Sequence, residues 1–388
     1  MASGPNELEV EMRRISWVRL AVALASLAVI AGLLFAPALA PWVLRFEHWT
    51  ADWRTAYLSD RAKSPNSRIA VVLINDDTLK DLPSSPIDRG LLAKLVMALK
   101  GSGASVIGLD ILFLKKTEDN KDRELLDALK VAPVVLGAID ERGRADLKTF
   151  QWDFQTAFLK EVGRPAGYLN LRHERDAVVR YAAAPAPGSQ YPKSFARLLA
   201  EASGATAIDS GDPIPWLLNP SDATSAFLTI PAQEILEKPD AAVASLRGRI
   251  VLVGGDFQNR DRHRVPLSVR DGEEMTGVMI HARILAGMLD KASAITELRP
   301  EMARWLLIGV GSIGLIFGWL LWQSNAVSFL RWTFATLLLL AIDALCFTTY
   351  HLLLPFTLAL IVWFASVTAG RALHFFATSI GWSKGALT

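Results

Sequence analysis

Six consecutive apolar residues, Ile69-Ala70-Val71-Val72-Leu73-Ile74, are followed directly by the polar triplet Asn75-Asp76-Asp77. An uninterrupted apolar run rich in β-branched residues is typical of a strand covered on both faces, as the strands of a parallel sheet are. The polar triplet predicts that the strand ends at Ile74. This short segment therefore favours an α/β fold.

The segments around this strand predict alternating strands and helices. Residues 88–100 place apolar side chains on one helical face, with Asp88 as N-cap and Gly101 as stop signal. Further strands are predicted at 105–109, 134–136 and 249–253, and further helices at 122–129, 193–203 and 275–291. We therefore predict a mostly parallel sheet with flanking helices. The stretch 140–225 is less regular.

The chain also contains four long apolar runs. Hydrophobic residues make up 51% of the sequence while 21% of residues are charged, which indicates separate membrane and water-soluble parts. About 20 apolar residues cross the hydrocarbon core as a helix. Transmembrane helices are therefore predicted at 17–44, 305–322, 332–350 and 352–370, one before and three after an α/β domain that occupies 45–304.

Basic residues beside these runs predict their orientation. Arg13 and Arg19 lie at the start of the first run, Arg331 lies between the second and third membrane helices, and Arg371 follows the last. Positively charged loops stay on the cytoplasmic side. We expect 1–16 and the tail 371–388 to be cytoplasmic, and 45–304 to face the periplasm or exterior of a bacterial inner membrane.

A cleaved signal peptide is the alternative interpretation of the first run. Ala38-Leu39-Ala40 resembles the small-residue site of a signal peptidase. Pro41 would follow the cut, where proline is expected to block processing, and the run is longer than a usual signal sequence. The sequence therefore favours an uncleaved anchor.

Three residues within the predicted membrane helices are unusual. Gly314 and Gly318 have the spacing of a helix-packing face. The glycine-rich pattern ending at Gly314 lacks the preceding strand that a dinucleotide-binding loop requires. Asp343 is a carboxylate inside an apolar run, which indicates either a functional group or a local pair, with Thr348 or Thr349 as candidate partners.

Composition and motifs exclude several functions. The 41 basic and 39 acidic residues give a net charge of +2, which offers no electrostatic basis for binding nucleic acid. The single cysteine, Cys346, excludes an intrachain disulfide and a cysteine-based zinc cluster. No phosphate-binding Walker loop, zinc-protease, hydrolase or kinase motif occurs. We expect a protein that is not an enzyme and has neither cofactor nor metal.

Candidate ligand-binding residues lie where the predicted strands end. Ligands of open α/β sheets bind outside the carboxyl ends of the strands, and adjacent parallel strands bring those ends together. The candidates, together with residues that a family resemblance adds, are Asp76, Asp77, Arg89, Asp110, Gly254, Asp256, Asp261 and His281.

Each candidate also has a purely structural interpretation. Asp76 and Asp110 suit the capping of the helices that follow them. Arg89, in the first turn of a helix, suits an ion pair with Asp76 or Asp110, or an anionic ligand. The basic loop 260–264 suits solvent exposure with local acidic partners, and His281, near the apolar face of its helix, suits a hydrogen-bonded core position.

The outer domain resembles the CHASE sensory domain, type two, over about 49–289. The residues that carry this resemblance are Ile74 to Leu79, Pro86, Arg89, Gly108 to Phe113, Asp122, Leu125, Asp176, Val179, Arg180, Ile250 to Gly254, Asp261, Pro266, Met275, Gly277, Val278, His281 and Ala282. Family members typically have one membrane helix before the domain and three after it, and continue into a cytoplasmic kinase or nucleotide cyclase. The family usually has aspartate where Asn75 stands, and tryptophans near Ser85 and Ile87.

The resemblance implies a sensory or regulatory membrane protein that binds an extracytoplasmic signal, either a small molecule or a protein. The chain ends about 18 residues after the last predicted membrane helix. We therefore expect it to act through a protein partner, such as a kinase, a cyclase or another envelope protein, or through a homo-oligomer in the lipid bilayer. Two alternatives remain: an assembly module of an envelope complex, and a metal-dependent hydrolase.

Overall fold

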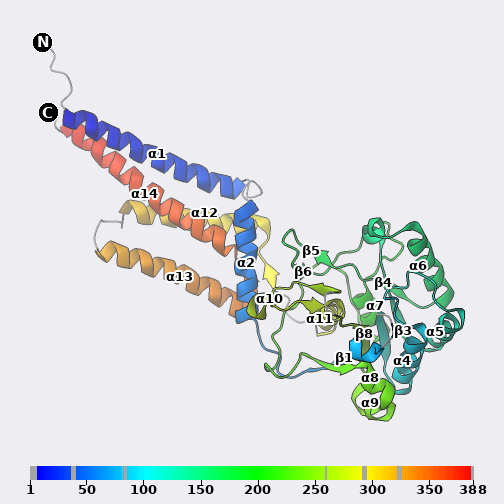
Figure 1. Ribbon diagram of the computed structural model, residues 1–388. Coiled ribbons are helices and arrows are strands. Elements are labelled where there is room, and N and C mark those ends of the chain that lie inside the picture. Colours follow the sequence, from blue (N-terminus) through cyan, green and yellow to red (C-terminus); the bar gives the residue numbers. More distant parts are fainter. Residues whose placement is uncertain are drawn as a thin grey trace. The chain divides into compact units, whose positions relative to one another are not determined.

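Strand β1 (Asn66–Ile74) is the second strand from one edge of a six-stranded parallel sheet in the computed structural model (Figure 1). The structure describes residues 7–35, 41–80, 82, 85–257, 260–290, 295–320 and 326–385. These residues form two units: Thr55–Ile295, which we call the α/β domain, and Met1–Arg54 with Thr296–Thr388, which we call the membrane unit.

The sheet has the order β4-β3-β2-β8-β1-β7, and every neighbouring pair is parallel. Its other strands are β2 (Val106–Asp110), β3 (Val134–Ala138), β4 (Ala166–Tyr168), β7 (Phe227–Pro231) and β8 (Ile250–Gly255). The late strand β8 is inserted between β1 and β2. The predicted parallel α/β fold is therefore confirmed.

Helices cover both faces of the sheet. The helices are α3 (Asp76–Leu79), α4 (Arg89–Gly101), α5 (Asp119–Val131), α6 (Thr149–Val162), α7 (Phe195–Ala202), α8 (Ala232–Glu237), α9 (Pro239–Leu246), α10 (Ser268–Asp271) and α11 (Gly277–Asp290). Helix α4 packs against α5 and α8 on one face, while α7 and α11 cover the other. Ala70 and Val72 of β1 belong to the core on the α4 side, and Ile69 and Val71 are equally buried. This double burial explains the continuous apolar run.

Short elements complete the domain. They are a 3-10 helix at Glu141–Asp146, β5 (Arg172–His173) paired with β6 (Val179–Tyr181), and β9 (Arg262–His263) paired with β10 (Met275–Thr276). Backbone hydrogen bonding joins β6 to the residue that follows β9, because the Val179 amide donates to the Arg264 carbonyl.

The membrane unit contains α1 (Glu7–Phe35), α12 (Pro300–Leu320), α13 (Ala326–Tyr350) and α14 (Phe356–Gly385). It also contains most of α2 (Pro41–Leu58), because the boundary between the two units falls after Arg54 of this helix. Two short strands, β11 (Thr296–Glu297) and β12 (Leu352–Leu353), pair with each other. Helices Pro300–Leu320, Val327–Tyr350 and Phe356–Thr378 are long and apolar enough to cross a bilayer, and α1 has a shorter apolar stretch, Trp17–Leu33. The chain is thus a multi-pass membrane protein.

Two predicted membrane helices have different bounds in the structure. The run 17–44 is not one helix, because a separate helix begins at Pro41. Proline favours the first position of a helix, where its fixed backbone angle suits the helix and its missing N–H is not needed. The last apolar helix starts at Phe356 rather than 352, since Leu352 and Leu353 form a strand, and it extends to Gly385. The edge strand β7, which ends in proline, and helix α6 were not predicted.

Candidate functional site

The carboxyl ends of β2, β8 and β1 meet at one place in the sheet. Asp110, the last residue of β2, is in register with Gly254 of β8, and Gly255 is in register with Ile74 of β1. The chain reaches β2 directly after β1 but returns to place β8 between them. This is the kind of topological switch point where open α/β sheets bind ligands.

Asp110 has an unusual environment at this edge. Its Oδ2 atom is buried and has no hydrogen-bond partner. Burial, together with the nearby carboxylate of Asp261, raises the pKa of Asp110 well above its ordinary value. A buried carboxyl group that lacks a partner is costly and is rare in folded proteins. Asp110 therefore offers an unused hydrogen-bonding position at the switch point.

Four further ionisable side chains form a series of contacts that reaches Asp110 through Asp261. Asp261 Oδ1 lies 3.0 Å from His263 Nε2, and His263 Nδ1 lies 3.0 Å from His173 Nε2. Both Asp261 and His263 influence the ionisation of the buried His281. We call Asp110, Asp261, His263, His173 and His281 the carboxyl-edge cluster.

The backbone positions Asp261 by an uncommon conformation. Its φ is +50°, a left-handed value that aspartate tolerates better than most residues. The Asp261 carbonyl accepts a hydrogen bond from the Gly277 amide at 3.1 Å. A Cβ atom on Gly277 would lie 2.6 Å from Asp261 Oδ2, so a larger residue at this position would require the Asp261 carboxylate to move.

His281 lies on α11 and is 4% exposed. Its ring packs edge-on against Phe195 and hydrogen-bonds to the backbone of Leu169, while its Nδ1 has no partner. Burial lowers the pKa of His281 to about 4, and the effect outweighs the opposing charge of Asp261. The side chain is therefore neutral at pH 7, as expected for a histidine in a protein core.

Gly254 contributes space rather than a side chain. A Cβ atom at this position would lie 2.5 Å from the Cβ of Val278 in α11. The glycine therefore allows α11, which carries His281, to pack closely on β8.

The other predicted ligand-binding residues are not in the cluster. Asp76 and Asp77 are exposed in α3, and Asn75 rather than Asp76 caps that helix by accepting from the Thr78 amide at 2.9 Å. An aspartate, usual for the family here, would cap equally well. Asp256 pairs with Arg262, as the solvated-loop interpretation predicts.

Arg89 forms a structural ion pair, but with a different partner from those predicted. Its side chain is 2% exposed, lies 3.7 Å from Asp122 and stacks on the ring of Phe113 at 4.5 Å. Asp88 caps α4 as predicted, accepting from the Leu91 amide at 2.9 Å. The expected pairing of Arg89 with Asp76 or Asp110 was wrong, because Asp122 is brought to it by the packing of α5 on α4.

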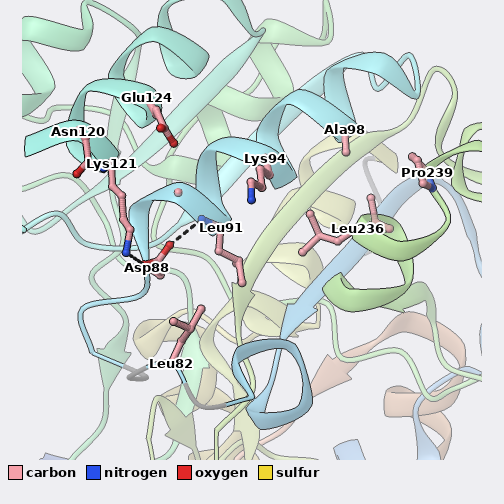
Figure 2. Close-up of a pocket in the computed structure, with 12 residues that line it drawn as sticks. Leu82, Asp88, Leu91, Lys94, Ala98, Asn120, Lys121, Glu124, Leu236 and Pro239 are labelled. Atoms are coloured by element: carbon pink, nitrogen blue, oxygen red, sulfur yellow. Dashed lines mark hydrogen bonds and ion pairs between the residues drawn. The ribbon is translucent and has the colours of Figure 1, made fainter. Parts of the chain in front are cut away.

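A groove of about 630 Å³ runs along α4, between α5 and the α8–α9 segment (Figure 2). Leu91 and Leu236 line its apolar part, and an ion pair of 2.9 Å between Lys121 and Asp88 lies at one end. None of the predicted ligand-binding residues lines it. This groove is therefore separate from the carboxyl-edge cluster.

In the membrane unit, Asp343 pairs with a charge far away in the sequence. Arg54 Nη1 donates to Asp343 Oδ1 at 2.7 Å, and its Nη2 lies 3.3 Å from Glu47 Oε1. Glu47 in turn accepts from the Leu358 amide, at the start of α14. The predicted pairing with Thr348 was wrong, since Thr348 donates instead to the Ala344 carbonyl. Asp343 thus joins α13 to α2.

The glycine pair of α12 forms a packing face inside the chain. Cβ atoms on Gly314 and Gly318 would meet Ser366 and the backbone of Val367 in α14. Gly370 of α14 approaches the Leu315 carbonyl of α12 in the same way. Helix α14 therefore packs closely against the glycine face of α12.

Sequence reasoning missed His173 and treated His263 only as part of the basic loop. Both lie in two-residue strands, where no periodic pattern is long enough to be recognised. The only indication of a role for these two residues in the sequence is their type, because the chain has just 6 histidines.

The fold and the membrane helices together define a class of protein. Its members are multi-pass membrane proteins with one parallel α/β domain, whose sheet has a topological switch point at the carboxyl ends of its strands. The family follows from comparison with known proteins. The model of the CHASE2 domain matches residues 25–324, most of the chain, so the chain belongs to the CHASE2 family and contains a CHASE2 sensory domain. No curated protein and no solved structure matched the chain.

Proposed function

We propose that the α/β domain binds a small-molecule signal at the carboxyl-edge cluster and that the protein relays this signal through a partner protein in the membrane. The observation that carries the proposal is the buried, unpartnered Oδ2 of Asp110 at the switch point. Membership of the CHASE2 sensory family supports a sensing role.

The charges of the cluster favour one chemical class of ligand. The carboxylate of Asp261 lies close enough to Asp110 to disfavour ionisation of the Asp110 carboxyl group. His281 is neutral at pH 7 and adds no compensating charge. A ligand with a protonated amine, or with several hydroxyl donors, would satisfy Asp110 and relieve the repulsion. We propose a cationic or donor-rich small molecule.

The orientation that we propose puts the α/β domain outside the cytoplasm. It rests on the basic residues Arg19, Arg331 and Arg371 beside the apolar helices. A periplasm-active reporter inserted after Asp77, and a cytoplasm-active reporter fused after the C-terminus, test it in cells. Activity of the opposite reporters at these positions would refute the orientation.

Ligand binding is tested on the full chain in detergent. A ligand that binds only the folded state raises its stability by RT ln(1 + [L]/Kd), which appears as a higher unfolding temperature. We expect amines or polyhydroxylated compounds from a small-molecule library to raise the unfolding temperature of the wild type and not of Asp110→Asn.

Asp77→Asn is the matched control, because it makes the same chemical change at an exposed position outside the cluster. It should respond like the wild type. A ligand that stabilises Asp110→Asn as strongly as the wild type refutes the assignment of the site. Absence of any hit, with stable co-purification of an envelope complex, would favour the assembly role instead.

A further inference from the structure

A second cavity lies at the opposite edge of the sheet, where the strands begin. It has a volume of about 190 Å³ and is lined by Asn66 at the start of β1, Phe227 at the start of β7, and Gly287 of α11. Lys63, Arg283 and Asp290 also line it. We call it the amino-edge pocket. It shares no residue with the carboxyl-edge cluster, so a ligand bound in this pocket would be independent of the proposed function.

Arg283 is the unusual member of this pocket. It is 5% exposed, and its Nη1 donates to the Leu217 carbonyl at 2.7 Å. Its Nε is buried without a hydrogen-bond partner. Within the part of the chain that the structure describes, no carboxylate forms an ion pair with it. Trp216, whose ring centre lies 5.8 Å from the guanidinium carbon, also has a buried indole N–H without a partner.

The acidic residue that lines the pocket, Asp290, already has partners. Asp290 forms an ion pair with Arg68 and accepts a hydrogen bond from Asn66 Nδ2 at 3.2 Å. Lys63, an exposed cation, lines the pocket as well. The pocket therefore has an excess of positive charge.

An unpaired buried cation is expensive, and arginine is normally buried only beside an anion. Burial lowers the pKa of Arg283 to about 10, with no acidic group to oppose it. It therefore remains charged at pH 7. A guanidinium whose Nη1 is occupied and whose Nε is free can still offer its other edge to an oxyanion, and arginine prefers such contacts with phosphate and carboxylate groups.

We propose that the amino-edge pocket binds a phosphate group, held by the guanidinium of Arg283 inside and by Lys63 at the rim. Two sources share this chemistry: free phosphate or a small phosphorylated compound, and the headgroup of an anionic phospholipid. The 190 Å³ volume suits the phosphate group itself rather than a large ligand.

The test uses the full chain in detergent, with inorganic phosphate as the first probe and chloride at equal ionic strength as the reference. Vesicles of phosphatidylglycerol, compared with vesicles of phosphatidylcholine, are the second probe. Dissociation constants are measured for the wild type and for Arg283→Met, which keeps an unbranched apolar side chain but removes the guanidinium group. Arg172→Met is the control, because Arg172 is half exposed and pairs with Glu174 outside the pocket.

We expect at least one probe to bind the wild type and Arg172→Met equally, and to bind Arg283→Met at least ten-fold more weakly. Binding of phosphate would indicate a soluble ligand, and selective binding of phosphatidylglycerol alone a lipid headgroup. If Arg283→Met does not fold, Lys63→Gln at the rim should weaken binding several-fold. Equal binding by the wild type and the pocket variant that folds, or no binding of either probe to the wild type, overturns the proposal.

Discussion

Acidification of the protein should destabilise the α/β domain through His281. Burial lowers the pKa of this side chain from 6.5 to about 4. At pH values between 4 and 6.5, the unfolded state therefore binds a proton at His281 and the folded state does not. Stability is therefore fully present above pH 6.5 and is lost as the pH falls towards 4. A difference of 2.5 pKa units corresponds to about 3 kcal/mol, because each unit is worth about 1.4 kcal/mol.

The size of this effect makes it measurable by thermal unfolding. For a domain of this length, about 1 kcal/mol shifts the unfolding temperature by about 2–4 °C, so His281 should contribute roughly 6–12 °C between pH 7 and pH 4. The assay records unfolding temperatures of the full chain in detergent across that range, for the wild type and for His281→Gln, which cannot take up a proton.

The variant isolates His281 from its neighbours. Asp110, whose pKa is raised by burial, stabilises the fold as the pH falls and so acts in the opposite direction. Asp110 is present in both proteins, so its effect cancels in their difference. The wild type should lose more stability than His281→Gln as the pH drops from 6.5 to 4. Parallel pH profiles for the two proteins would refute the assignment of a neutral, buried His281.

Three further predictions concern other parts of the chain. Asp110→Asn should raise the unfolding temperature at neutral pH, because asparagine avoids the cost of ionising a buried acid, and a lower unfolding temperature than the wild type would contradict this. Asp343→Asn should cost about 1–3 kcal/mol, because it removes the closest carboxylate partner of Arg54 and leaves Glu47 as the remaining one. Recovery of folded protein equal to that of the wild type, judged by size-exclusion chromatography in detergent, argues against this. Gly318→Ala should lower the free energy of unfolding by about 1–3 kcal/mol, because the added Cβ forces α12 away from α14. Gly309→Ala is the control: its Cβ meets nothing within 4 Å, so its unfolding temperature should match that of the wild type. Similar losses of stability in both variants would rule out the packing explanation.

The fold was largely accessible from the sequence, and the site was accessible only in part. The sequence selected Asp110 and Gly254 because they lie at predicted strand ends. The family resemblance added Asp261 and His281. The structure brings these four residues together. Asp256 was also selected but is held by Arg262.

Whether a candidate residue lies in the carboxyl-edge cluster depends on distances that no local pattern contains. Asp76 and Asp110 both follow buried strands, yet one is exposed and the other has a buried oxygen without a partner. The difference arises because the loop that carries Asp261 and His263 lies by Asp110, and nothing near Asp76 in the sequence indicates which carboxylate that loop will reach.

The sequence alone determined most strands of the sheet, most helices, the Asp88 cap and the apolar runs. These depend on neighbours within a few residues, so hydrophobic periodicity and capping side chains reveal them directly. Only the tertiary structure decided that β8 lies between β1 and β2, and which charges meet. Arg54 and Asp343 are 289 residues apart, and a contact of that kind is chosen by the packing of whole elements rather than by the residues beside it.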